Sequence, residues 1–226
     1  ELSQWGVKKM NELMWLNPPP EGNVLQAKEL LNQLGAIEND KITPSGKELL
    51  KMPTHPRIAH LLAQAKQWQP LDDTINFIAL ASDVASLLEE RDPLKKEEGK
   101  DVSLRVEILR KWRSGERVNA ERHALERIER VAQAWRKSLK INVDNTTPDM
   151  FAIGKLIAAA YPERVAKRID KNGLRYRLSN GRIVKLQEHD SLHQHEYLAI
   201  AQLDAGTNEG KVFMASPLNP DDLMDL

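Results

Sequence analysis

The 226-residue sequence has no cysteine, few aromatic residues and no surplus of charge of either sign. The absence of cysteine excludes disulfides and thiolate zinc sites, which agrees with a reducing cytoplasm. Lysine and arginine together number 33, and so do aspartate and glutamate, so the formal net charge is zero. Because proteins dedicated to nucleic-acid binding are usually basic overall, any such binding here must come from a local patch.

Long apolar segments are missing as well. No stretch approaches the ~20 residues that a helix needs to cross a bilayer. The first ten residues, ELSQWGVKKM, lack the basic and then apolar pattern of a signal peptide. We therefore expect a cytoplasmic protein that does not associate with a membrane. The chain does not begin with Met, and we expect it to be a piece of a longer protein.

Motifs for catalysis are also absent. The phosphate-binding pattern GxxxxGK[ST] does not occur, since Gly46-Lys47 follows ITPS, and there is no DEAH sequence. Serine and histidine occur without the nucleophile-elbow pattern of hydrolases. We therefore expect no catalytic residue in this chain and no turnover of ATP by it alone.

One histidine pattern could be read as a metal site. His189, His193 and His195 form H-x3-H-x-H beside Glu188 and Asp190. Without a thiol or a regular element to hold tetrahedral ligands, we interpret this stretch as a polar loop. We expect neither a metal nor another cofactor in the chain itself.

The strongest local signals lie between residues 23 and 62. Asn23 is the expected N-cap of a helix that ends at Gly35, since glycine suits the left-handed position after a helix. Isoleucines flank the polar turn in residues 37–42, which indicates a short hairpin. Thr43-Pro44 and Pro56 each open a further helix. The order helix, hairpin, helix, helix is typical of a winged helix.

The same region carries a dense motif. Its members are Pro19, Pro20, Ala27, Leu30, Leu31, Leu34, Gly35, Ala36, Thr43, Gly46, Met52, Pro53, Pro56, Arg57, Ala59 and Leu62. This spacing resembles the helicase-associated winged-helix segment of DEAH-box helicases. LASDVASLLEERDPL at 80–94, LIAAAYPERVAKRI at 156–169 and YRLSNGRIVKL at 176–186 resemble the bacterial HrpB-type branch. The resemblance covers nearly the whole chain.

The resemblance implies a C-terminal accessory region of an ATP-dependent RNA helicase. Two RecA-like motor domains, which bind ATP and Mg in that family, precede this region and are absent here. We expect these motor domains to be the intramolecular partner, in the same polypeptide. We expect single-stranded RNA, or single-stranded DNA, to be the other partner.

The expected fold is mainly α with a small β part, in three domains. Residues 1–53 would form a winged helix preceded by an amphipathic helix over 2–16, with Trp5 and Trp15 in the core. Residues 54–160 would form a helical bundle, which resembles the ratchet domain of the family. Residues 161–226 would form a small β-barrel, OB-like in the family and either complete or truncated here.

Apolar spacing places the bundle helices along the chain. We expect helices over 70–90, capped by Asp72 or Asp73, over 101–113, from Asn119 to 139, and from Asp149 onward. Residues 95–100, KKEEGK, are predicted to be a solvated loop. In the helix over 101–113, Arg105, Arg110, Lys111 and Arg113 cover the faces away from the apolar residues. In the helix from Asn119, the basic residues opposite the apolar side are interpreted as a solvated surface of i,i+4 ion pairs with Glu121, Glu126 and Glu129; they are Arg122, Arg127, Arg130, Arg136 and Lys137.

After Tyr161 the spacing of the apolar residues changes from the helical period of about 3.6 to the strand period of about 2. Leu174, Tyr176 and Leu178 alternate with polar residues, and Asn180-Gly181 indicates a hairpin. Further strands are expected at 197–203 and 211–215, and a helix after Pro162. Residues 161–185 include eight basic residues and only two acidic ones, which is the marked charge asymmetry of the chain.

We expect nucleic acid to bind at this basic segment. Phosphates would meet the cations and a base would stack on the tyrosine. The candidate site residues are Arg164, Lys167, Arg168, Arg175, Tyr176, Arg177, Arg182 and Lys185. One alternative is a winged-helix DNA-binding regulator with a helical effector or dimerisation domain, although the expected recognition helix has only Lys47 and Lys51 as basic residues. A protein-interaction scaffold is a third alternative, favoured by the zero net charge.

Overall fold

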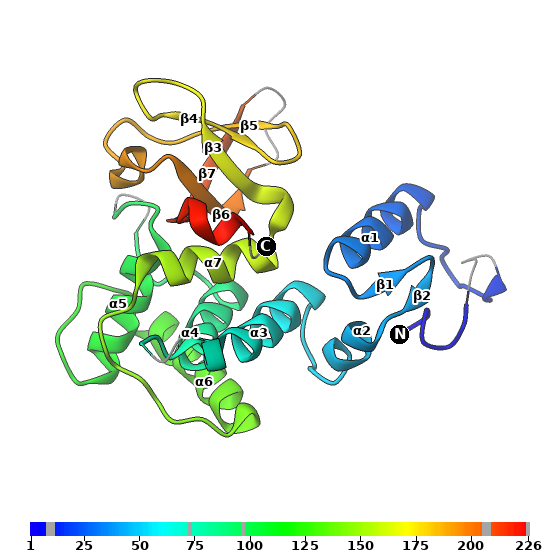
Figure 1. Ribbon diagram of the computed structural model, residues 1–226. Helices are drawn as coiled ribbons and strands as arrows, with labels where there is room; N and C mark the ends of the chain where they lie inside the picture. Colours follow the sequence, from blue (N-terminus) through cyan, green and yellow to red (C-terminus); the bar gives the residue numbers. More distant parts are fainter. Residues whose placement is uncertain (8–11, 72–73, 96–97, 205–208, 225–226) are drawn as a thin grey trace. The chain divides into compact units, whose positions relative to one another are not determined.

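A computed structural model describes residues 1–7, 12–71, 74–95, 98–204 and 209–224. It contains seven α-helices and a closed barrel of five strands within these ranges (Figure 1). The chain divides into two compact units, Glu1–Ala63 and Gln64–Leu226. The division into three domains at residues 53 and 160 stays a prediction. No helix in the described part of the chain is both long and apolar enough to span a membrane.

The first unit contains α1 (Glu21–Gln33), β1 (Ile37–Glu38), β2 (Lys41–Ile42), α2 (Pro44–Leu49) and the start of α3 (Pro56–Trp68). Helix α1 begins after Pro20, and no side chain caps it, so the predicted cap at Asn23 is wrong. Its end is as predicted. Gly35 has φ 62°, and the N–H groups of Gly35 and Ala36 donate to carbonyls of the last turn, which closes the helix in a Schellman motif.

Two local features stabilise the hairpin and the start of α2. Asn39 and Asp40 both have positive φ, 49° and 61°, so they form the two-residue turn of type I′ that matches strand twist. Thr43 caps α2, because its Oγ1 accepts a hydrogen bond from the Gly46 N–H at 2.9 Å, and Pro44 is the first helical residue. The predicted hairpin and the second and third helix starts are confirmed.

The N-terminal segment differs from the prediction. The described residues before Pro20 form turns and coil rather than a helix over 2–16, and residues 8–11 lie outside the described ranges. Gly6 at φ 81° ends the first turn. Trp5 is 72% exposed and Trp15 is 39% exposed, so neither is a core residue. An apolar periodicity can form a helix only where a surface receives its apolar face.

The second unit holds α4 (Phe77–Glu89), α5 (Val102–Arg113), α6 (Arg122–Leu139) and α7 (Met150–Ala160), which pack on one another. Asn76, Asp101 and Asp149 cap α4, α5 and α7 by accepting backbone N–H bonds. The predicted start of α4 at residue 70 is therefore wrong, and its predicted caps lie outside the described residues. Helix α6 begins after Glu121 rather than at Asn119.

The barrel consists of β3 (Val165–Arg168), β4 (Arg175–Leu178), β5 (Ile183–Lys185), β6 (Tyr197–Leu203) and β7 (Gly210–Pro217), in the order β3-β4-β5-β7-β6. Strand β3 pairs with both β4 and β6, which closes the barrel. The predicted helix after Pro162 is wrong, because a single 3-10 turn (Pro162–Arg164) leads directly into β3. Strands β5 and β7 pair in parallel.

Helix α7 packs against β6 and β7 (Figure 1). A Cβ atom on Gly154 would lie 1.8 Å from the carbonyl oxygen of Pro217, so only glycine permits this approach. The segment before α5 is also attached to the barrel. The Lys100 N–H donates to the Asp190 carboxylate at 3.1 Å, and its carbonyl accepts from Ala215 at 3.0 Å. Lys100 is 6% exposed, so the predicted solvated loop is wrong at this end.

Candidate nucleic-acid interface

The outer face of the barrel carries basic side chains from three adjacent strands. Along β4, Arg175 and Arg177 are exposed while Tyr176 and Leu178 are buried, as strand alternation requires. The register places Arg175 opposite Lys185 on β5, and Lys185 opposite Lys211 on β7. We call Arg175, Arg177, Lys185 and Lys211 the basic face.

Like charges placed directly opposite one another destabilise a sheet. Lys167 of β3 adds to the same pattern, because it lies opposite Arg177. The barrel therefore carries these cations at a cost in stability, which a bound anion would offset.

These basic side chains differ in whether they form an ion pair with a carboxylate. Arg175 forms an ion pair with Glu209, and Lys167 lies 3.6 Å from Glu196. Hydrogen bonding to Tyr197, with the charge of Glu196, raises the pKa of Lys167 above its ordinary value. Among the described residues, none forms an ion pair with Arg177, Lys185 or Lys211. These three side chains have their full charge available to a ligand.

Three of the other predicted site residues serve the barrel instead. Arg164 lies over the ring of Tyr161 at 4.4 Å and donates to the Ala201 carbonyl at 2.9 Å. Arg168 donates to the His193 carbonyl at 3.3 Å, and Arg182 to the Asp204 carbonyl at 3.3 Å. Their polar atoms are engaged with the backbone of neighbouring segments.

The stacking role predicted for Tyr176 is wrong. Its side chain is 0% exposed and lies in the barrel core. The hydroxyl donates to the His195 carbonyl at 2.7 Å, and the Leu192 carbonyl lies 3.2 Å from it. Burial raises the pKa of Tyr176 to about 12. The alternation that marks β4 as a strand also directs this ring inward, away from any ligand.

Lys211 was not among the predicted site residues. It lies 26 positions after Lys185 in the chain, and only the parallel pairing of β5 and β7 brings the two together. Its position in a predicted strand was the available signal, since alternation exposes Lys211 and buries Val212.

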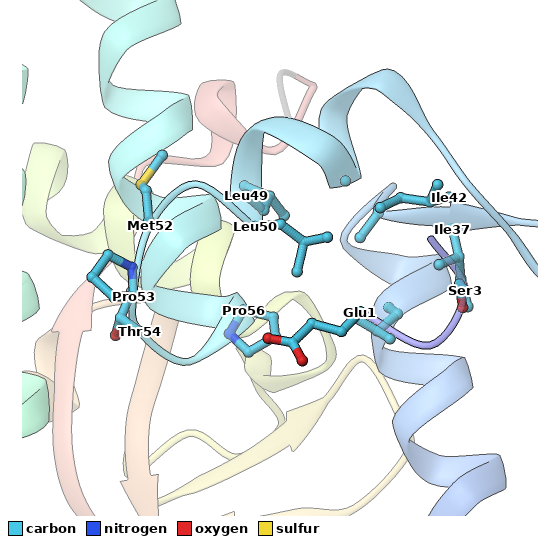
Figure 2. A pocket seen from close by; sticks show the side chains of 13 residues that line it. Glu1, Ser3, Ile37, Ile42, Leu49, Leu50, Met52, Pro53, Thr54 and Pro56 are labelled. Carbon is cyan, nitrogen blue, oxygen red and sulfur yellow. The ribbon is translucent and has the colours of Figure 1, made fainter. Parts of the chain in front are cut away.

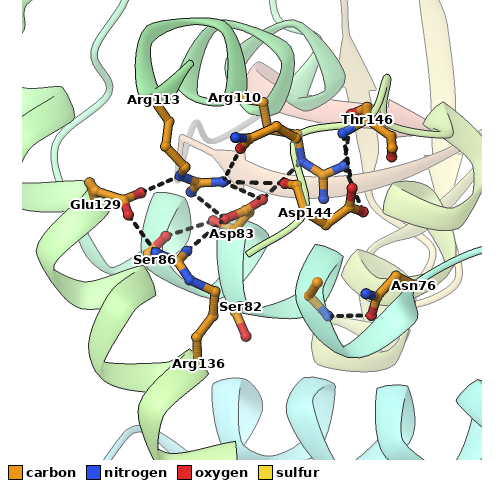
Figure 3. A network of polar contacts seen from close by, with 12 residues as sticks. Asn76, Ser82, Asp83, Ser86, Arg110, Arg113, Glu129, Arg136, Asp144 and Thr146 are labelled. Atoms are coloured by element: carbon orange, nitrogen blue, oxygen red, sulfur yellow. Dashed lines mark hydrogen bonds and ion pairs between the residues drawn. The ribbon is translucent and has the colours of Figure 1, made fainter. Parts of the chain in front are cut away.

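A second charged cluster is buried between α4, α5 and α6 (Figure 3). Asp83 of α4 accepts from Arg110 at 2.9 Å, from Arg113 at 2.6 Å and from Arg136 at 3.5 Å. Glu129 joins Arg113 at 2.6 Å and also pairs with Arg136. Three cations thus meet Asp83, Glu129 and Asp144, and the charges of the cluster balance.

The cluster also fixes the segment between α6 and α7. Arg110 Nη1 lies 3.2 Å from the Asp144 carboxylate and donates to the Thr146 carbonyl at 2.9 Å. Burial opposes the charge of Arg113, but the carboxylates of Asp83 and Glu129 outweigh it and raise its pKa. The surface interpretation is therefore wrong for Arg110, Arg113 and Arg136. Because carboxylates neutralise these arginines, they are structural and leave little charge for a nucleic acid.

The first unit has an apolar hollow of about 520 Å³ beside α2 and the hairpin (Figure 2). Ile37, Ile42, Leu49 and Leu50 line it, with prolines at its edge. Helix α2 has only six residues, and its neighbour Lys51 is paired with Glu48 at 2.6 Å. With six residues, α2 is short for a helix that reads bases in the major groove, and Lys47 is its one basic residue.

The histidine segment offers no metal site among the described residues, where no three suitable side chains converge. His193 Nδ1 lies 2.6 Å from the Asp190 carbonyl oxygen. His195 is half-buried, and burial lowers its pKa.

Comparison with known proteins gives consistent relatives, although no family model matches the chain. The chain is 30% identical to the ATP-dependent RNA helicase HrpB of Escherichia coli K12, over 99% of this chain and 24% of that protein. A crystal structure of the E. coli DExH-box NTPase HrpB superposes with a TM-score of 0.73 and 27% identity, over 99% of this chain and 24% of that chain. A crystal structure of the Escherichia coli DEAH/RHA helicase HrpB superposes with a TM-score of 0.73 and 26% sequence identity, over 97% of this chain and 24% of that chain.

The resemblance to HrpB is confirmed. The chain spans about a quarter of the length of the HrpB proteins it matches, which fits a C-terminal region. The similarity to HrpB supports a helicase-associated region and does not favour the DNA-binding regulator.

Proposed function

We propose that this chain is the accessory region of an HrpB-like, DEAH-box RNA helicase and that it binds single-stranded RNA through the basic face. Arg177, Lys185 and Lys211 carry this proposal, because they are exposed on three adjacent strands and form no ion pair with any residue that the structure describes. Phosphate contacts from such residues bind a strand without reading its bases. Single-stranded DNA would bind through the same contacts.

The proposal assigns a role to each part of the chain. Helix α1, the hairpin and α2 form a winged helix, helices α3 to α7 a ratchet-like bundle, and the barrel an OB-like domain. The strand order and the parallel pairing of the third and fifth strands support the OB-like assignment. RecA-like motor domains in the same polypeptide would bind ATP and Mg, and this region would couple their motion to the RNA.

Fluorescence anisotropy with a labelled oligouridine at several salt concentrations tests the binding. Each phosphate contact with a single strand contributes about −0.7 to the slope of log K against log salt. Replacing Arg177, Lys185 and Lys211 together with Ala should flatten the slope by about 2 and weaken binding similarly for different base sequences.

A matched variant removes three exposed cations from the helices, at Lys66, Arg130 and Lys137. It changes the net charge by the same amount and should keep the wild-type slope. Equal slopes for both triple variants, or no salt-dependent binding by the wild type, would contradict the proposal. The second outcome would favour a protein-interaction scaffold.

A further inference from the structure

A cleft of about 840 Å³ lies within the second unit, beside the barrel. Phe213 and Gln202 line it from β7 and β6, and residues 91–95, 100, 105 and 119–121 line it from the segments around α4, α5 and α6. Phe213 is 38% exposed, although it belongs to a strand that is otherwise largely buried. An exposed aromatic ring in the lining of a cleft is suited to stacking with a planar group such as a base.

The cleft adjoins the basic face. Lys211 and Phe213 are both exposed on β7, on either side of the buried Val212, and the pairing of β7 with β6 shifts its register at Phe213. The row formed by Arg175, Lys185 and Lys211 therefore leads across the sheet to this ring.

Charge at the cleft favours an anionic ligand. Four cations line it, Arg91, Lys95, Lys100 and Arg105, against the carboxylates Asp92 and Glu121. Asp92 and Arg105 neutralise each other, because they are joined by bonds of 2.8 Å and 3.3 Å, so the other charged lining residues are Arg91, Lys95 and Lys100 against Glu121. Arg91 is exposed and forms no ion pair with a described residue.

We infer that Phe213 is the stacking platform for a base of the single strand, and that Arg91 binds an adjacent phosphate in the cleft. The inference rests on the proposed function and adds the path that the strand takes from the basic face. Ring stacking tolerates any base, because every base has a π-face. Phe213 thus fills the role that the buried Tyr176 cannot.

The test compares Phe213→Ala with Phe151→Ala in the same anisotropy titration with oligouridine. Phe151 is a matched control, since it is 37% exposed and lies on α7, outside this cleft. Loss of stacking should weaken binding by about 5- to 150-fold in Phe213→Ala and leave the salt slope unchanged. Phe151→Ala should bind like the wild type. Arg91→Ala should flatten the slope by about 0.7.

Two further measurements separate stacking from folding. Phe213→Leu and Phe213→Trp both keep an apolar side chain at this position, and only Trp should retain affinity. A 5-iodouridine oligonucleotide should also photocrosslink to the peptide that contains Phe213.

The outcomes distinguish the inference from the proposed function. Wild-type affinity in both Phe213→Ala and Phe213→Leu, with a flattened slope in the triple variant of the basic face, would overturn the inference and keep the proposed function. Absence of binding by the wild type would overturn both. Equal binding by the Leu and Trp variants with reduced binding by Ala alone would show a packing role and overturn the inference.

Discussion

Lys185 of β5 lies directly opposite Lys211 of β7 in the parallel pair of strands that completes the barrel. Two exposed cations in this position repel each other, and neither has an ion pair among the described residues. The two positive charges therefore favour the binding of an anionic ligand and, by repelling each other, lower the stability of the barrel.

Replacing Lys211 with Glu should strengthen the barrel and weaken its binding to RNA. An opposite-charge pair across two strands stabilises by roughly 0.2–1 kcal/mol, whereas like charges destabilise. Urea unfolding should show a slightly higher midpoint, and anisotropy should show weaker binding with a flatter salt slope. A variant that loses both stability and binding would contradict this account.

Replacing Tyr176 with Phe should destabilise the barrel without changing RNA affinity. The hydroxyl donates to the carbonyl of His195, and a buried hydrogen bond contributes about 1 kcal/mol. The ring stays in the core, so the basic face keeps its shape. Chemical unfolding and anisotropy measured on one preparation check both parts, and reduced affinity at full stability would restore a direct role for Tyr176.

Replacing Asp83 with Ala should destabilise the second unit by about 3–5 kcal/mol. The change removes a carboxylate that faces Arg110, Arg113 and Arg136 and leaves buried charge uncompensated. Glu107→Ala is the control, because Glu107 pairs with Lys111 on the exposed side of α5. That variant should unfold at the wild-type midpoint, since exposed pairs contribute little.

Asp144 should make stability depend on acid pH. Burial opposes its ionisation, but hydrogen bonds from Thr146 and the charge of Arg110 outweigh burial and lower its pKa below 3.8. A lowered pKa stabilises the fold above the unfolded value, and this contribution disappears as the pH falls through the folded value. Asp144→Asn should therefore be less stable than the wild type at pH 6, and the difference should shrink below about pH 4. Urea unfolding at pH 6, 4 and 3 measures it, and a constant difference would exclude the mechanism.

Prediction from the sequence was most accurate where a few neighbouring residues decide the structure. Thr43 caps a helix through a bond to a residue three positions away, and Gly35 ends one through its own backbone angle. Asn180-Gly181 joins β4 to β5 as predicted, with only Gly181 at positive φ. Such signals act within one turn and do not depend on the rest of the fold.

Features that depend on distant partners were missed or misread. Arg110, Arg113 and Arg136 have the spacing of surface residues, and only the packing of three helices brings them to Asp83. The error at Tyr176 is of another kind, because alternation already places Tyr176 on the same side of β4 as Leu178, and that side faces the core.

The sequence by itself determined the cap at Thr43, the helix end at Gly35, the hairpins and the HrpB-like pattern, because these depend on spacing along the chain. Only the tertiary structure decided which barrel cations have no ion pair among the described residues and that Phe213 is exposed beside a cleft. Lys185 and Lys211 meet through strand pairing over more than 20 residues of intervening chain, and pairing at that distance is selected by the burial of the whole barrel core.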